Sequence, residues 1–414
     1  MRTFVRLSLE SCFVAFLLAV PSARAQNDYH PQRPPMDALR SKHLDLLEQL
    51  NTKGEKGQLM ELDDPQIPPL LTKGWGLTGA YAAQHLEYFP KASTRELESI
   101  FAGFAPPPHG FKSRYGNFLE YDSYAFRGEA IRIAPSVYVV HASYGVEFLT
   151  STFMVVGRNQ EGHFQELWNI KDLAAEHYAQ RDEIGRWLHL VSRAYYNGPL
   201  AVGRVLPLSP AANGHPRFVV DAYQGAGGGT ILAQLSIWEW DGIRAKPLLV
   251  ELYQYAADFG RFHFDGRTLQ IATKEETGTF FSCGMCPQPR GVWTLKITPT
   301  GVEDLGHRFL QPEVQWADEL LAKVGKGADT TKIADPSVAA TLKTKIDEIK
   351  AESAAVANSS SSETRKLSWG MLGECHVLRR GQFGSFALDL DKGKLHFSYR
   401  LRNGRPYFTG VRVD

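Results

Sequence analysis

The middle of the chain alternates apolar and polar residues over several consecutive stretches. In residues 137–142, for example, Val137, Val139 and His141 fall on one face of an extended segment, and the intervening residues fall on the other. A period of two is that of a β-strand, because successive side chains along a strand point to opposite sides. We therefore expect residues 111–312 to form a β-rich body.

Other stretches of this region have the same strand-like character, and they are residues 146–157, 164–170, 217–223, 231–240, 261–272 and 292–298. The spacing of these stretches predicts a mainly β fold, built either as a sandwich or as partial propeller-like sheets. Two aromatic-x-aromatic-Asp-Gly pieces occur in this region, at Trp238–Gly242 and at Phe262–Gly266. The Asp-Gly pairs are turn signals. The shared pattern hints at a repeat, although two copies are too few to define one.

Helical patterns precede the β-rich body, in an N-terminal section of residues 26–110. Leucines at helical spacing predict a helix over residues 36–50. A capping box formed by Ser93 and Glu96 predicts the start of a second helix.

A further helical segment, residues 313–356, is expected after the body. It divides into one helix at 313–324 and another that begins after Asp335-Pro336, a favourable helix start. Residues 357–366 contain a serine run, which predicts a flexible linker to the C-terminal section, residues 367–414.

The first 25 residues have the three parts of a secretory signal peptide. Arg2 and Arg6 supply positive charge, residues 13–20 are apolar, and Ala23-Arg24-Ala25 places small residues at a cleavage site. The apolar run is too short to span a bilayer, and no later stretch is long and apolar enough. We therefore predict a soluble, exported protein that begins at Gln26, either periplasmic or extracellular.

Basic residues are concentrated at the C-terminal end. Residues 365–414 contain ten Lys or Arg against four Asp or Glu, a local charge of +6. The whole chain carries +1 and residues 1–25 carry +2, so residues 26–364 sum to −7 (1 − 6 − 2). The C-terminal section is therefore the candidate for an anionic partner, such as an anionic polymer or an acidic protein. Nucleic acid is not expected as a partner.

This C-terminal section is predicted to be a three-stranded antiparallel meander. Its strands are expected at Phe383–Leu390, Lys394–Arg402 and Arg405–Val413. Asn403-Gly404 forms a two-residue hairpin turn, because both residues tolerate the positive φ that such a turn requires.

The last hairpin of this meander provides the candidate ligand-binding residues. Strand alternation places Arg400 and Arg402 on the outer face, where Arg402 is expected opposite Arg405, Arg400 opposite Tyr407 and Ser398 opposite Thr409. Like charges directly opposite each other destabilise a hairpin unless solvent or an anion separates them. We therefore predict an anion-binding face, and its residues are His396, Arg400, Arg402, Arg405 and Tyr407. The alternative is an ordinary solvated sheet face.

Cys283 and Cys286 form the most conspicuous motif of the chain. A thioredoxin-like site requires a following helix, but Pro287 and a strand-like run come next. In an oxidising compartment, a small disulfide between the two cysteines is the simplest interpretation, with redox or metal chemistry as alternatives. Neither a cofactor nor a metal is predicted, and Cys375 is expected to be a buried, unpaired thiol.

Three other motifs fit structural roles better than catalytic ones. Residues 225–230 (GAGGGT) precede a strand-like run, whereas phosphate-binding loops precede a helix. Ser143 lies in a strand-like context, which differs from the strand-to-helix turn of a hydrolase nucleophile. Trp238 and Trp240 lie in a strand that is apolar on both faces and are expected in the core.

None of these motifs lies in the sequence context that its catalytic role requires. We therefore predict an exported, β-rich binding or envelope-associated protein, with an anionic ligand docked on the C-terminal hairpin. The alternative is a secreted or periplasmic hydrolase that acts on envelope or extracellular polymers, with catalytic residues scattered along the chain.

Overall fold

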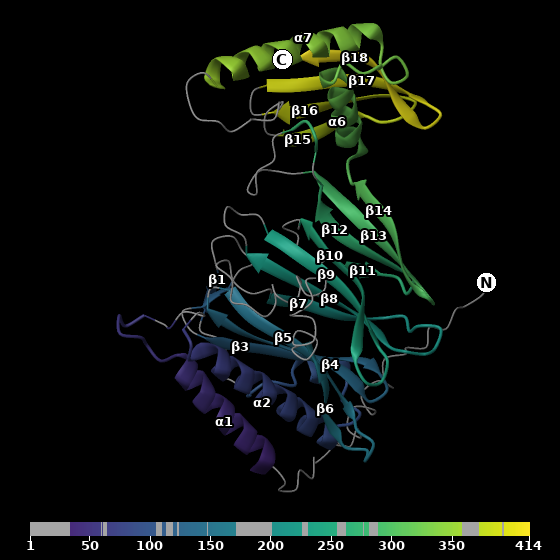
Figure 1. Cartoon of the computed structure of the whole chain (residues 1–414). Coiled ribbons are helices and arrows are strands. Elements are labelled where there is room, and N and C mark those ends of the chain that lie inside the picture. Colours follow the sequence, from purple (N-terminus) through teal and green to yellow (C-terminus); the bar gives the residue numbers. More distant parts are fainter. Residues whose placement is uncertain are drawn as a thin grey trace, which may run out of the picture.

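The computed structural model describes residues 34–58, 60, 64–104, 110–112, 119–121, 124–146, 148–170, 201–225, 231–254, 262–275, 277–280, 289–357, 372–390 and 393–414. Over these residues the protein is mainly β, as the sequence predicts (Figure 1). Four sheets of four strands each follow one another along the chain, and every neighbouring pair of strands is antiparallel. None of the described helices is both long and apolar enough to cross a membrane.

Each sheet is a meander in which strands adjacent in sequence are also adjacent in space. The first sheet contains β3 (Ala125–Ala134), β4 (Val137–Val146), β5 (Phe148–Arg158) and β6 (Phe164–Asn169). The second contains β7 (Ala201–Leu208), β8 (Arg217–Gly225), β9 (Ile231–Trp240) and β10 (Ala245–Gln254). The third contains β11 (Phe262–Phe264), β12 (Thr268–Lys274), β13 (Arg290–Thr298) and β14 (Gly301–Phe309). Two short strands, β1 (Gly110–Lys112) and β2 (Leu119–Tyr121), pair with each other before the first sheet.

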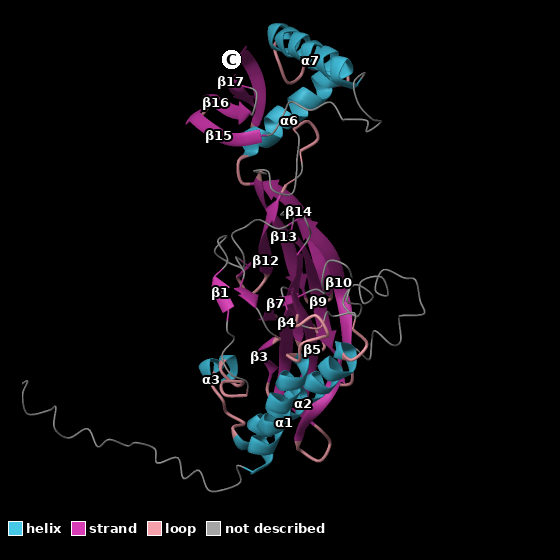
Figure 2. Ribbon diagram, turned by 90° about the vertical axis from the view of Figure 1, so that its left-hand side faces the viewer, coloured by secondary structure: helices cyan, strands magenta, loops and turns pink. Residues whose placement is uncertain are grey.

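Helices cover the outer face of the first sheet (Figure 2). They are α1 (Pro34–Leu50), α2 (Ile67–Tyr88) and α3 (Thr94–Glu98), and α3 begins with the predicted capping box of Ser93 and Glu96. Buried His43 bridges the layers, with Nδ1 3.1 Å from the Phe104 carbonyl and Nε2 2.8 Å from the Tyr144 hydroxyl. Burial lowers the pKa of His43 to about 4, so its imidazole is neutral in the core at neutral pH.

The other face of the first sheet packs against the second sheet through aromatic side chains. The rings of Phe153 and Trp238 lie 5.3 Å apart, and those of Trp168 and Trp238 lie 5.9 Å apart. Trp238 and Trp240 are buried here, which confirms their predicted place in the core.

The second and third sheets pack through a further apolar layer that includes Leu235, Leu269 and Trp293. A buried arginine joins these two sheets at one end of the layer. Arg217 donates from Nε to Glu239 (2.8 Å) and from Nη1 to the Thr298 carbonyl (2.6 Å). Because its donors are satisfied by a carboxylate and by backbone carbonyls, Arg217 is accommodated in the interior.

A separate layer follows at the C-terminal end, where α6 (Pro312–Gly325) and α7 (Pro336–Ala357) cover one face of the fourth sheet (Figure 1). This C-terminal sheet contains β15 (Leu372–Arg379), β16 (Phe383–Leu390), β17 (Gly393–Arg402) and β18 (Arg405–Val413). Asp318 of α6 accepts hydrogen bonds from the backbone of Gly278 (3.1 Å) and Thr279 (2.9 Å), which precede the third sheet's β13. Phe280 then enters the core of the C-terminal layer, so side-chain contacts connect it to the sheets below.

Two differences from the sequence-based expectations have clear causes. The meander has four strands instead of three, because β15 pairs with β16. The sequence did not predict β15, because bulges interrupt its register and hide the alternation of its residues. The longest described helix of the N-terminal section, α2, was not expected, because its prolines and glycines resemble helix breakers. Its prolines occupy the first turn, where they are tolerated, and Gly74 and Gly79 allow close packing on the first sheet. A β-carbon at Gly74 would overlap the Tyr144 hydroxyl.

The two aromatic-x-aromatic-Asp-Gly pieces form the same kind of turn at different places in their sheets. Asp241 accepts hydrogen bonds from two following backbone amides between β9 and β10, and Asp265 does so between β11 and β12. The first turn joins the last two strands of its sheet and the second joins the first two. The pattern is therefore a recurring turn sequence.

Buried Asp221 of β8 makes the stability of the sheet stack pH-dependent. Burial raises the pKa of Asp221 to about 7, although a hydrogen bond from the Tyr253 hydroxyl (2.8 Å) and the charge of Arg204 act in the opposite direction. The folded protein thus holds a proton that the unfolded chain has released above about pH 4. Stability is therefore lost as the pH rises from about 4 through about 7.

We predict that Asp221→Asn increases stability above neutral pH, because asparagine accepts the Tyr253 hydrogen bond without ionising. The gain in the free energy of unfolding, measured by urea denaturation, is expected to be near zero at about pH 4 and to reach up to about 4 kcal/mol at about pH 8. Asp241→Asn is the matched control, because the pKa of Asp241 is lowered to about 2 by its hydrogen bonds with Lys246 and with backbone amides, against the effect of burial. Its effect should be constant between about pH 5 and 8. An Asp221→Asn effect that is equally constant would contradict the buried, protonated carboxyl.

Candidate functional site

The C-terminal sheet has one covered face and one open face. Phe386, Phe397 and Phe408 point toward α6 and α7 and are fully buried. Alternate residues of β16 and β17, such as Ser385 and Ser398, point to the opposite side. All of the predicted anion-binding residues lie on this opposite, outer face.

The three predicted arginines lie at one end of the outer face, together with Tyr407. We call this the arginine end and define it as Arg379, Arg400, Arg402, Arg405 and Tyr407. The registers place Arg400 opposite Tyr407 and Arg402 opposite Arg405, as expected. The Asn403-Gly404 turn between them has φ of 52° and 76°, which confirms the predicted hairpin. Arg379 of β15 joins this end opposite Ser385.

Tyr407 forms the floor of the arginine end. The guanidinium carbon of Arg402 lies 3.3 Å from the centroid of the Tyr407 ring, and that of Arg400 lies 5.1 Å away. The Tyr407 hydroxyl donates a 2.8 Å hydrogen bond to Asp335 at the start of α7, and this bond raises the pKa of Tyr407. The aromatic ring thus holds two guanidinium groups in place by cation–π contact.

Negative charge reaches the arginine end through the Asp335 carboxylate, which contacts the Tyr407 hydroxyl and forms no described ion pair with an arginine of this end. Among the described residues, no carboxylate forms an ion pair with any of its four arginines. The Nε atom of Arg400 is buried and has no hydrogen-bond partner in the described part of the chain. A buried N–H group without an acceptor is unfavourable.

The other end of the outer face differs, because its charges are paired with one another. Asp414 lies 2.9 Å from His396 and 2.8 Å from Arg412. Asp389 lies 3.0 Å from both His376 and Lys394. His396 therefore belongs to this paired end, and the structure does not bring it together with the other four predicted ligand-binding residues.

One predicted cross-strand pair is wrong. Ser398 lies opposite Gly410 instead of Thr409, because a register shift separates the Ser398 and Tyr399 pairs. The extra residue in β18 is Thr409, whereas Tyr407 and Phe408 keep the regular register and point to opposite faces. Sequence alternation alone cannot locate such a bulge.

Two members of this site were missed by sequence reasoning. Arg379 was missed because β15 was not recognised as a strand. Asp335 was interpreted only as a helix start, but its carboxylate contacts Tyr407, 72 positions further along the chain. The parallel bridge between Ala334 and Phe408 brings the two segments together.

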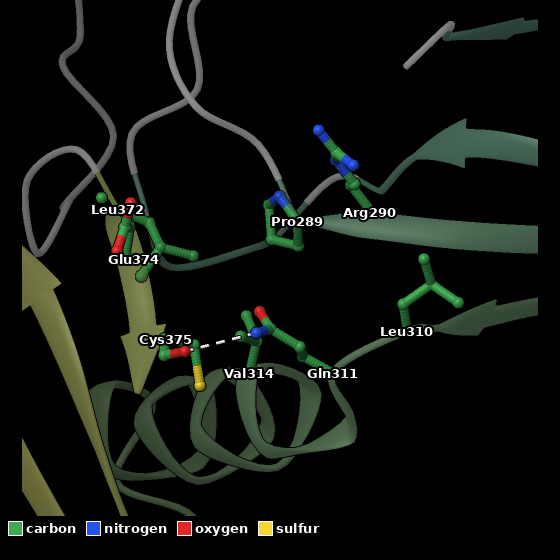
Figure 3. A pocket seen from close by; sticks show the side chains of 9 residues that line it. Pro289, Arg290, Leu310, Gln311, Val314, Leu372, Glu374 and Cys375 are labelled. Atoms are coloured by element: carbon green, nitrogen blue, oxygen red, sulfur yellow. Dashed lines mark hydrogen bonds between the residues drawn. The ribbon is translucent and has the colours of Figure 1, made fainter. Parts of the chain in front are cut away.

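A pocket lies where the third sheet meets the C-terminal layer (Figure 3). Its volume is about 480 Å³. Apolar side chains form much of its wall, with Arg290 and Glu374 at its sides. Gln311 crosses it and donates a 3.2 Å hydrogen bond to the Cys375 carbonyl. These contacts connect the end of β14 to β15.

The thiol of Cys375 is not positioned for chemistry in this pocket. Figure 3 shows its sulfur turned toward α6. Burial and the charge of Glu313 raise the pKa of Cys375 to about 12, so the reactive thiolate is disfavoured. Cys375 is free and half-buried, close to the expectation of a buried, unpaired thiol.

A second polar group lies between the first and second sheets. His141 is 6% exposed, and its Nε2 is 3.3 Å from a carboxylate oxygen of Glu129. Its Nδ1 is buried without a hydrogen-bond partner in the described residues. Ser143 follows two positions later in β4, which is paired on both sides, so it is a strand residue as expected.

Several sequence predictions concern residues that lie outside the described ranges. They include the signal peptide, the pair Cys283 and Cys286, and most of the glycine-rich stretch, of which Gly225 ends β8. The strand β9 begins at Ile231, in agreement with the predicted strand after this stretch. The described residues contain no cluster of three or more side chains suited to a metal ion.

No family model matches this sequence, and no curated protein matches it.

We predict that Tyr407→Phe and Tyr407→Ala separate the two roles of this side chain. The phenylalanine variant loses the hydrogen bond to Asp335 but keeps the ring, so its thermal midpoint should fall by only a few degrees. The alanine variant also loses the support for Arg400 and Arg402 and leaves a cavity, so its midpoint should fall much further. Calorimetry of both variants checks this order. Equal losses would show that the ring contributes nothing beyond the hydroxyl.

Proposed function

We propose that this protein is an exported binding protein that docks an anionic group on the arginine end of its C-terminal sheet. Export is supported by the signal-peptide pattern of residues 1–25. Binding is supported by the local excess of +6 in residues 365–414 and by the position of Arg400, Arg402 and Arg405 on one open face.

The observation that carries this proposal is the grouping of Arg400, Arg402 and Arg405 on one face without an ion-pair partner in the described residues. A phosphate, sulfate or carboxylate group would supply acceptors to the exposed guanidinium groups of Arg402 and Arg405. Guanidinium groups bind such anions through paired, charge-assisted hydrogen bonds, which are about twice as strong as neutral ones. The anion would also relieve the repulsion between Arg402 and Arg405, which face each other across the turn.

We predict that Arg400→Gln/Arg402→Gln weakens the binding of polyanions. The protein beginning at Gln26 would be titrated with dextran sulfate, with neutral dextran as the uncharged comparison. Loss of two charge-assisted contacts should raise the Kd for dextran sulfate by about ten-fold or more.

The matched control is Lys394→Gln/Arg412→Gln. It removes the same charge from the hairpin of β17 and β18, but at the paired end, where both side chains already contact carboxylates. This control should change the Kd by less than about two-fold. Equal effects of the two double variants would indicate attraction by net charge alone and would contradict a site at the arginine end.

The alternative of a hydrolase is favoured by one observation, the contact between His141 and Glu129. The hydrogen bond from His141 lowers the pKa of Glu129, so the carboxylate is ionised and accepts from Nε2. The lone pair of the buried Nδ1 would then be available as a general base.

This alternative predicts hydrolysis of chromogenic esters or glycosides that depends on His141. His141→Gln should lower kcat/KM by about 100-fold or more. His163→Gln, at an exposed histidine between β5 and β6, serves as the control. Hydrolysis that is undetectable in the wild type, or unchanged in His141→Gln, would exclude this role.

A further inference from the structure

Two large apolar side chains are exposed beside the arginine end. Phe383 is 62% exposed and Leu378 is 63% exposed, whereas the aromatic residues of the inner face are buried. Phe383 lies directly opposite Arg400 in the register of β16 and β17. Leu378 precedes Arg379 at the irregular end of β15. The surface is therefore both cationic and apolar.

These side chains lie near two chain turns at the same end of the sheet. The Leu401 amide donates a 2.8 Å hydrogen bond to the Gln382 carbonyl, which ties the turn before β16 to the end of β17. Arg380, in the first of these turns, is held by Glu313 at 3.1 Å and remains largely exposed. Arg402 and Arg405 flank the second turn. The end of the sheet thus presents arginines and apolar side chains together on a rigid, hydrogen-bonded rim.

The surface of a lipid bilayer supplies partners for both kinds of side chain. Anionic headgroups attract nearby basic residues, and the boundary with the acyl chains accommodates aromatic and aliphatic groups. A dissolved polyanion would satisfy the arginines but would leave Phe383 and Leu378 in water. The combination of the two therefore favours a membrane surface over a dissolved polymer.

We propose that the arginine end docks on the surface of an anionic lipid bilayer, an inference that rests on the proposed function and names its partner. The guanidinium groups of Arg400, Arg402 and Arg405 contact lipid phosphates, and Phe383 and Leu378 enter the boundary between headgroups and acyl chains. The protein binds the surface without spanning the bilayer.

The test is flotation of the protein beginning at Gln26 with vesicles of phosphatidylglycerol and phosphatidylethanolamine, compared with vesicles of phosphatidylcholine alone. The wild type is expected to float with the anionic vesicles and to remain unbound with the neutral ones. Leu378→Ser/Phe383→Ser should weaken anionic vesicle binding by about ten-fold, while its Kd for dextran sulfate stays within about two-fold of wild type. The control is Ile243→Ser/Leu305→Ser, which changes two exposed apolar residues of the second and third sheets.

The outcomes separate this inference from the proposed function. If the wild type binds dextran sulfate through its arginines but ignores anionic vesicles, the membrane inference is overturned and a dissolved polyanion or acidic protein takes its place. The membrane inference is also overturned if Leu378→Ser/Phe383→Ser and Ile243→Ser/Leu305→Ser bind anionic vesicles equally well. If Arg400→Gln/Arg402→Gln matches the wild type with both dextran sulfate and vesicles, the proposed function itself is overturned. Thermal melts of each variant confirm that the sheet is folded.

Discussion

The architecture depends on the burial of sheet faces against one another. A four-stranded meander has two faces, and with apolar residues on both it is stable only when each face is covered. The first sheet meets the helices on one side and the second sheet on the other, and the third sheet covers the second. Trp238 lies at the centre of this arrangement, because its ring contacts both Phe153 and Trp168 across the interface.

The C-terminal layer follows the same rule with helices in place of a neighbouring sheet. The helices α6 and α7 pack on the inner face, and no described element covers the outer face (Figure 2). An open sheet face normally carries polar residues, and the charged residues of this face are paired differently at its two ends. At one end Asp389 and Asp414 neutralise the nearby basic groups, and at the other the arginines share the ring of Tyr407. This division within a single face is the strongest indication that the arginine end serves a ligand.

The candidate site could be predicted in part. Arg400, Arg402, Arg405 and Tyr407 were assigned to one face because the Asn403-Gly404 turn sets the register of the hairpin next to it. That register holds for a few residues and is lost at the bulge between the Ser398 and Tyr399 pairs. The partner of His396 lies beyond this bulge, at Asp414, so its place at the paired end could not be inferred from the turn.

The sequence by itself determined the features that depend on neighbouring residues along the chain. These are the period-two strands, the capping box at Ser93, the start of α7 at Pro336 and the hairpin turn at Asn403. Tertiary structure alone decided how these elements meet. It made a stable helix of α2, whose glycines fit against the first sheet, and it placed Asp335 beside Tyr407. The reason is that local preferences arise within a few residues, whereas packing and charge pairing depend on groups that only the folded chain brings together.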